Sequence, residues 1–259
     1  MRPGTYDVVV AWSGGKDSTL ALAALRADPR YRVVALLTTV TRGYDRISMH
    51  GVRRTVLEAQ VGALGLPLIE ASIAPGASNR EYEGAFALAL RTARERWPRL
   101  RHIAFGDLFL TDVRQYREAL LASLDWTGIF PLWGEDTAAL AQAFVGAGYR
   151  AVLTCVDTTQ LGPEFAGREF DATLLADLPA TVDPCGERGE FHTCVYAGPL
   201  FAEPLSLILG ERVRRDARFE YCDVELAPSA ASSRGSHSEA CPGCSRHGRG
   251  SSLPGAFGP

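Results

Sequence analysis

The sequence predicts an α/β protein built on a doubly wound, Rossmann-like parallel sheet, and three observations carry this prediction. An apolar, β-branched run at residues 8–10 stops at a Ser-Gly-Gly turn and is followed by an Ala- and Leu-rich segment, which is typical of strand, tight loop and helix. Residues 32–39 form a predominantly apolar run, as expected for a strand buried on both faces of a parallel sheet. Strand-like and helix-like segments then alternate at the spacing of βαβ units.

Composition indicates a soluble globular protein. The 259 residues are 46% hydrophobic and 22% charged, and no apolar run is long enough to cross a bilayer. The first residues do not resemble a signal peptide, so we expect a cytoplasmic protein without a membrane partner. The six cysteines are scattered, which indicates reduced thiols. A net charge of −3 disfavours a large nucleic-acid interface.

Three regions are expected along the chain. Residues 1–126 hold the alternating segments and form a first, larger α/β domain, and residues 127–227 form a smaller C-terminal α/β subdomain. In residues 228–259, 18 of 32 positions are Gly, Pro or Ser, a composition that cannot bury enough apolar surface to order itself. We therefore expect a disordered tail. Cys241 and Cys244 in it are a weak metal-binding signal, because one CxxC pair lacks a second.

The loop at residues 13–18 is the first candidate site. At a helix entrance the first backbone N–H groups lack internal partners and, with the helix dipole, attract phosphate. Here two glycines let an anion approach the main chain, a lysine adds a positive charge and two serines add hydroxyl donors. An aspartate follows the lysine, so this is not a Walker A loop. The six residues are Ser13, Gly14, Gly15, Lys16, Asp17 and Ser18.

The following elements continue the alternation. The carboxyl end of the second strand, at Thr38, should face the nucleotide, because ligands of open α/β sheets lie beyond the carboxyl ends of the strands. His50 is expected to open an amphipathic helix, either as its cap or as a group that approaches bound phosphates. Further strands are expected at residues 66–72 and 102–105, with a long helix at residues 80–96 between them.

A second candidate site follows the strand at residues 102–105. Gly106 and Asp107 come at its carboxyl end, where a carboxylate is well placed for chemistry. Arg114 and Arg117, three residues apart, share one face of the next predicted helix, and arginine forks suit carboxylates and phosphates. Spacing alone leaves a second interpretation open, namely a capped helix with a solvated charged face.

The C-terminal subdomain is expected to begin with a helix at residues 138–147 and a buried strand at residues 148–156. A final helix after residue 203 and a strand at residues 219–226 should complete it.

The third candidate site is a glycine-rich segment between these elements. Gly186 and Gly189 predict a loop, and Glu187 and Glu190 supply carboxylates for binding an amine, holding Mg²⁺ or acting as bases. A surface turn with solvated acids is the alternative.

Residues 13–18, Ser-Gly-Gly-Lys-Asp-Ser, resemble the pyrophosphate loop (PP-loop) of the N-type ATP pyrophosphatases in the adenine nucleotide α-hydrolase superfamily. Later motifs narrow the resemblance. Gly106-Asp107, the Asp-x-Arg-x-x-Arg pattern at residues 112–117 and Gly-Glu-x-Gly-Glu-Phe-His-Thr at residues 186–193 are similar to the diphthine-ammonia ligases, also called the diphthamide-synthesis ATP-binding family. The resemblance covers residues 6–200. The Asp-Pro-Cys-Gly-Glu form at residues 183–187 is associated with bacterial members, in which diphthine is not the expected substrate.

This resemblance implies an AMP-forming carbon–nitrogen ligase that uses ATP and Mg²⁺. A small-molecule or protein-borne carboxylate would be adenylated with release of pyrophosphate, and ammonia would then form an amide; a homodimer is left open. The implied catalytic residues are Lys16, Asp107, Glu187 and Glu190. The implied nucleotide-binding residues are Ser13, Gly14, Gly15, Lys16, Asp17, Ser18, Thr38 and His50. The implied substrate-binding residues are Arg114, Arg117, Glu187 and Glu190, and the implied metal ligands are Asp17 and Asp107.

Two other functions stay open from the sequence. One is a PP-loop enzyme that adenylates a tRNA base and delivers sulfur or an amine, for which Cys241 and Cys244 are the supporting signal. The other is an adenine-nucleotide-binding module without catalysis.

Overall fold

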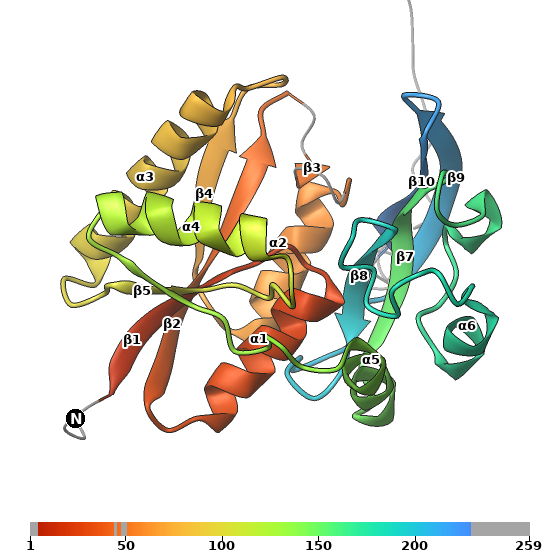
Figure 1. The fold of residues 1–259 in the computed structure, drawn as a ribbon, viewed down its shortest axis with the longest axis horizontal. Coiled ribbons are helices and arrows are strands. Elements are labelled where there is room, and N and C mark those ends of the chain that lie inside the picture. The colour runs from red at the N-terminus through yellow and green to blue at the C-terminus, as the bar shows by residue number, and fades with distance from the viewer. Residues whose placement is uncertain (1–4, 44–45, 48–50, 229–259) are drawn as a thin grey trace, which may run out of the picture. The chain divides into compact units, whose positions relative to one another are not determined.

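A computed structural model describes residues 5–43, 46–47 and 51–228. The chain forms a compact unit up to Ala227, and this unit contains two β-sheets (Figure 1). The predicted disordered tail, with Cys241 and Cys244, and the predicted nucleotide contact His50 lie outside the described residues. Among the residues that are described, no helix combines the length and the apolar character needed to span a membrane.

The first sheet confirms the predicted α/β architecture. Five of its strands are parallel and pair in the order β4-β2-β1-β5-β6, while β3 adds an antiparallel pairing to the end of β2. The strands are β1 (Tyr6–Ala11), β2 (Tyr31–Thr41), β3 (Arg46–Ile47), β4 (Leu68–Ile73), β5 (His102–Ala104) and β6 (Thr127–Ile129). Because β6 pairs with β5, the first sheet reaches past the domain boundary predicted at residue 126.

Alternate side chains of β1 enter two different cores, which shows that both faces of the sheet are covered. Val8 and Val10 pack in the cluster that contains Leu22 of α1, whereas Val9 packs in the cluster that contains Phe86 of α3. A strand has a side-chain period of two, so a continuous valine run serves both faces. The helices are α1 (Lys16–Ala27), α2 (Arg54–Leu64), α3 (Asn79–Arg96) and α4 (Thr111–Ser123). Helices α1 and α2 contribute to the first core, and α3 and α4 to the second.

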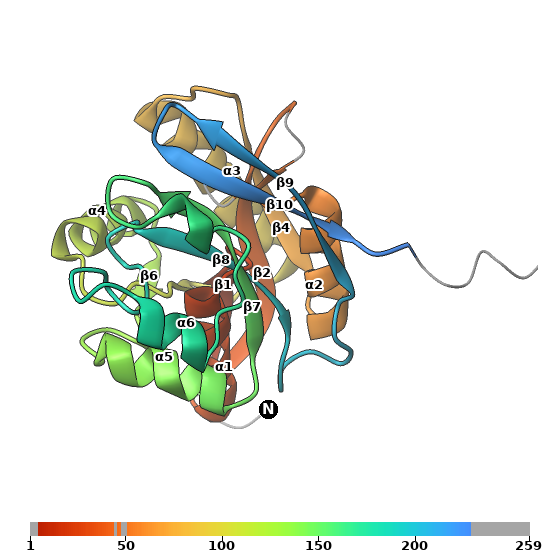
Figure 2. The same cartoon turned by 90° about the vertical axis from the view of Figure 1, so that its right-hand side faces the viewer.

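The second sheet is antiparallel, with strand order β8-β7-β10-β9 (Figure 2). Its β8 contacts α1 and its β10 contacts α2, so this sheet packs against the helices on one face of the first sheet. Its strands are β7 (Arg150–Asp157), β8 (Phe191–Ala197), β9 (Leu207–Arg215) and β10 (Phe219–Leu226). Helices α5 (Thr137–Gly146) and α6 (Ala172–Asp177) and the 3-10 turn η1 (Pro163–Phe165) complete the smaller C-terminal α/β part.

Two predicted elements differ from the structure. Helix α2 begins at Arg54 rather than at His50, because Gly51 has φ +67° and Arg53 is extended, so neither belongs to a right-handed helix. The final helix predicted after residue 203 is wrong. The chain there forms strand β9, which turns back into β10 through Asp216 and Ala217, both with positive φ, a geometry that suits a tight hairpin.

Candidate functional site

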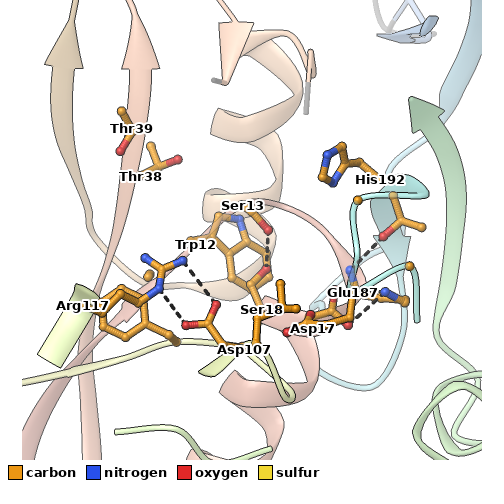
Figure 3. Close-up of a pocket in the computed structure, with 18 of the residues that line it drawn as sticks. Trp12, Ser13, Asp17, Ser18, Thr38, Thr39, Asp107, Arg117, Glu187 and His192 are labelled. Atoms are coloured by element: carbon orange, nitrogen blue, oxygen red, sulfur yellow. Dashed lines mark hydrogen bonds and ion pairs between the residues drawn. The ribbon is translucent and has the colours of Figure 1, made fainter. Parts of the chain in front are cut away.

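A cavity of about 770 Å³ lies beyond the carboxyl ends of β1 and β5 and beside residues 37–39 of β2. Helices α1 and α3 cover opposite faces of the sheet here, so this is the switch point at which open α/β sheets bind ligands. The cavity is lined by the loop after β1, residues 37–39 of β2, the loop after β5, residues 186–189 of the loop before β8 and residues 191–193 of β8 (Figure 3). Of the predicted site residues it brings together Ser13, Lys16, Asp17, Ser18, Thr38, Asp107, Arg117 and Glu187.

The loop after β1 has the predicted strand–loop–helix geometry. Gly15 is the N-cap of α1 and has no side chain to cap it, and the Ser13 and Ser18 hydroxyls face each other at 3.3 Å. Gly14 has φ +79°, and a Cβ there would lie 2.6 Å from Oε1 of Gln60. This position therefore requires glycine for both backbone conformation and space.

The second sheet completes the loop. The Lys16 N–H, the first of helix α1, donates to the Thr193 hydroxyl at 3.0 Å, and the Val195 N–H donates to the Gly14 carbonyl at 2.9 Å. Thr193 thus supplies from strand β8 the cap that Gly15 cannot provide.

Gln60 is a residue of this site that the sequence analysis missed. Its side-chain amide is fully buried and donates to the carbonyls of Gly14 (3.0 Å) and Val195 (2.6 Å). One feature of the sequence could have revealed it: Gln60 comes four residues after Val56, so a polar side chain occupies the apolar, buried face of α2. A buried amide needs partners, and here the partners lie in the PP-loop-like turn and β8.

Lys16 is buried at the base of the cavity, with 2% of its side chain exposed. Its ammonium donates to both carboxylate oxygens of Asp17 at 2.9 Å and to the carbonyl of Cys185. Burial alone would lower the pKa of Lys16, but the Asp17 carboxylate and nearby negative groups outweigh it and raise the pKa above its ordinary value. Lys16 is therefore a fixed positive charge that joins the loop after β1 to the segment before β8.

Gly106 and Asp107 lie against the same loop. A Cβ on Gly106 would be 2.7 Å from the Asp17 carbonyl carbon, so glycine allows the two backbones to touch. Asp107 forms an ion pair with Arg117, 2.7 Å between Oδ2 and Nε, and the Arg117 guanidinium lies over the Phe105 ring. Arg117 is thereby held at the cavity wall.

Arg114 is not brought to the cavity. Its guanidinium lies against the rings of Phe130 and Trp133, 4.7 and 4.6 Å from their centres, and its Nε is 2.8 Å from Glu118. The three-residue spacing suggested that Arg114 and Arg117 both bind substrate. In the structure Arg114 instead packs α4 against the segment at residues 130–133.

Glu187 faces the cavity from the second sheet's side. Its Oε1 accepts backbone N–H groups of Leu108 (2.7 Å) and Phe109 (3.4 Å) in the loop after β5. Burial raises the pKa of Glu187 to about 7, aided by the charges of Asp17 and Asp107 and opposed by the bond from Leu108. Such a carboxyl changes protonation near neutral pH.

Glu190 has a different position from its neighbour. It is buried and does not line the cavity; its oxygens accept the backbone N–H groups of Asp183 (3.0 Å) and Arg188 (2.9 Å). These bonds shape the loop that presents Glu187.

Two further polar side chains line the cavity. Within the described residues, the buried Thr38 hydroxyl has no hydrogen-bond partner, a condition that a ligand atom would relieve. His192, which the sequence analysis did not single out, has its pKa lowered to about 4 by burial and by Lys16. It is therefore neutral near pH 7.

Two family models match consecutive parts of the chain, and together they contain the motifs described above. Residues 6–117 match the diphthamide synthase N-terminal domain, and residues 136–227 match the diphthamide synthase C-terminal domain. The chain belongs to the diphthamide synthase family. A curated relative, the diphthine–ammonia ligase of Schizosaccharomyces pombe, is 26% identical over 232 residues, which are 83% of this chain. The chain spans 38% of the length of that relative.

Both domains of the diphthamide synthase family contribute to the cavity. The N-terminal match contains the loop at residues 13–18 and Asp107, while the C-terminal match contains Glu187 and Thr193. The hydrogen bonds of Thr193 and Glu187 cross from one matched domain to the other. The site is therefore complete only when both parts of the family fold are present.

Proposed function

We propose that this diphthamide synthase family member is an ATP-dependent, AMP-forming ligase that converts a carboxylate to an amide. The observation that supports this most is the convergence in one cavity of a phosphate-type loop, a buried lysine and a carboxyl group with a pKa near neutrality. The relative's name designates diphthine and ammonia as its substrates. For this chain we propose the same type of reaction and specify its substrate only as a carboxylate.

ATP would bind with its phosphates at the N-terminus of α1. The helix dipole and the Ser13 and Ser18 hydroxyls favour anions there, and Lys16 supplies a positive charge behind the loop. The unpartnered Thr38 hydroxyl at the end of β2 would bond to the nucleoside part.

The reaction has two steps. A carboxylate oxygen of the substrate attacks the α-phosphorus of ATP, pyrophosphate leaves, and an acyl-adenylate forms. Ammonia nitrogen then attacks the acyl carbon, and AMP leaves with one former carboxylate oxygen. Glu187, with its pKa of about 7, would accept the proton that ammonium must lose before it can attack. Arg117 would hold the substrate's carboxylate from the cavity wall.

The residues present also fit Mg²⁺, which supplies charge neutralisation on the phosphates when bound. Mg²⁺ in nucleotide sites uses one or two protein carboxylates together with phosphate oxygens. Asp17 and Asp107 are the carboxylates that would serve, and their charges already act on Glu187. Within the described part of the chain, no group of three or more His, Cys, Asp or Glu side chains could hold a metal by itself, which is consistent with a metal that arrives with ATP.

The test is to incubate the chain with ATP, Mg²⁺, ammonium and a panel of carboxylates, and to identify the nucleotide product. We expect AMP and pyrophosphate, with ¹⁸O from a labelled carboxylate recovered in AMP. ADP as the product would overturn the proposal, and so would AMP without the label. Lys16→Ala should abolish turnover, whereas Glu187→Ala should keep nucleotide binding and lose amide formation.

The alternatives give different outcomes in the same assay. A tRNA-modifying enzyme would release AMP with tRNA and would lose activity in the Cys241→Ser/Cys244→Ser variant. A nucleotide-binding module would bind ATP without releasing pyrophosphate with any substrate.

A further inference from the structure

Two arginines on the second sheet's side of the cavity share an unusual arrangement. Arg188, in the loop before β8, and Arg218, in the turn before β10, both line the cavity and are more than half exposed, at 57% and 53%. The carboxylates behind them, Glu190 and Asp157, are each 1% exposed. Each pair therefore turns its positive end toward the cavity and its negative end into the protein.

Arg218 is positioned in advance of any ligand. Its Nε and Nη2 donate to the two oxygens of Asp157 at 3.1 and 2.6 Å, and Asp157 is itself held by Thr159 and Gln160. A guanidinium carries five N–H donors, so this fork leaves three N–H groups, including both on Nη1. Phe219, the next residue, supports the guanidinium at 4.9 Å.

Arg188 is held more loosely. Its Nη1 is 3.8 Å from Glu190, whose oxygens are already engaged by backbone N–H groups. Its guanidinium lies 5.4 Å from the centre of the Phe109 ring. Most of its hydrogen-bonding capacity is thus available to a ligand.

The residues that line the cavity from the first sheet and its helices have a different charge arrangement. Lys16 pairs with Asp17, and Arg117 pairs with Asp107, with all four residues lining the cavity. Glu187, in the same loop as Arg188, adds a further carboxyl to the cavity. On the side of the first sheet each cation meets a carboxylate that also lines the cavity, whereas the carboxylates paired with Arg188 and Arg218 are buried and do not line it, so these two pairs present their positive ends to a ligand.

We infer that Arg188 and Arg218 form a subsite for an oxyanion, a carboxylate or phosphate group of the second substrate, apart from the carboxylate that reacts. Arginine forks bind such groups in two-point fashion. This inference rests on the proposed function, and it narrows the substrate class to compounds with two anionic groups.

The test measures anion binding to the full chain by calorimetry, with the loop already occupied by α,β-methylene-ATP. Succinate and inorganic phosphate are titrated separately, so that the two arms distinguish carboxylate from phosphate. In Arg188→Gln and Arg218→Gln we expect the Kd of the preferred anion to rise about tenfold or more, as for loss of a charge-assisted contact. The Kd of the nucleotide analogue should stay within about twofold of the wild-type value. This is far less than a tenfold change, which corresponds to about 1.4 kcal/mol.

Arg214→Gln is the matched control. Arg214 lies in the same hairpin, loses the same charge when substituted, and pairs with Glu220 outside the cavity. An equal effect of Arg214→Gln would mean that general electrostatics and not a subsite governs binding, and would overturn the inference. Binding of neither anion to the wild type would overturn it as well.

The remaining outcomes separate the subsite from the proposed function. Weaker binding of the analogue in Arg188→Gln or Arg218→Gln would assign these arginines to ATP and overturn the subsite. If the analogue fails to bind the wild type, the proposed function fails, while titration without nucleotide still tests the subsite. Should Arg218→Gln fail to fold because Asp157 loses its partner, Arg188→Gln carries the test, since Glu190 keeps its backbone bonds.

Discussion

The hydroxyl of Thr193 accepts a hydrogen bond from the backbone N–H of Lys16 at 3.0 Å, although 177 positions separate the two residues. This bond joins the first turn of α1 to strand β8, and the Gly14–Val195 bond lies beside it. The phosphate-type loop is therefore held by the second sheet as well as by its own sequence.

Thr193→Val should destabilise the protein and weaken nucleotide binding. Valine keeps the volume of threonine but leaves the Lys16 N–H without its acceptor, a loss of about 1 kcal/mol in the free energy of unfolding. Thr193→Ser keeps the hydroxyl and should keep wild-type affinity for α,β-methylene-ATP. Denaturant unfolding and calorimetry measure the two effects. Equal affinities for the valine and serine variants would show that the cap does not support the loop.

Gly106→Ala should weaken nucleotide binding because its new Cβ would lie 2.7 Å from the Asp17 carbonyl carbon and displace the loop. The overlap with backbone should also lower the free energy of unfolding by about 1–3 kcal/mol. Gly84→Ala is the control: this glycine lies in α3 with nothing within 4 Å of the new Cβ, so it should stabilise by about 0.5–1 kcal/mol. A Gly106→Ala variant with wild-type nucleotide affinity would contradict the close contact.

Glu187→Gln should change how stability depends on pH. The pKa of Glu187 is about 7 in the folded protein against an ordinary 4.5, so between these values the folded state keeps a proton that the unfolded state has released. The free energy of unfolding of the wild type should consequently fall as pH rises from 4.5 to 7. The glutamine variant has no ionisable group at this position, so its free energy of unfolding should not show this fall. The two curves should diverge by about 2–3 kcal/mol. Parallel curves from pH 4.5 to 8 would contradict the raised pKa. In the proposed reaction, wild-type amide formation should rise through about pH 7 as Glu187 loses its proton.

Arg114→Gln and Arg117→Gln should differ in their effect on turnover. Arg117 pairs with Asp107 at the cavity wall, so its replacement should lower AMP formation. Arg114 packs against the rings of both Phe130 and Trp133, so its replacement should cost about 1 kcal/mol of stability and spare turnover. Loss of turnover in Arg114→Gln with normal folding would restore the role that the sequence suggested for it.

Much of the fold was predictable because its signals are local. The valine run before Gly14, the helix after Lys16 and the alternation through β5 all report on neighbouring residues, and the structure confirms the α/β class. The start of α2 was predicted too early because Gly51 adopts a left-handed conformation that a periodic apolar pattern does not reveal. Strand β9 was predicted as a helix because most of its side chains are exposed, so its pairing with β10 leaves no clear alternating pattern.

The sequence by itself determined the family and the residues of the loop at 13–18, because motif identity and order are properties of the chain. Only the tertiary structure decided which side chains meet at the cavity. It brought Glu187 to the loop after β5, turned Glu190 inward and left Arg114 on another surface. It also added Gln60 and Thr193 to the loop. These contacts join residues far apart in the chain, and they depend on how two sheets pack, which no local pattern encodes.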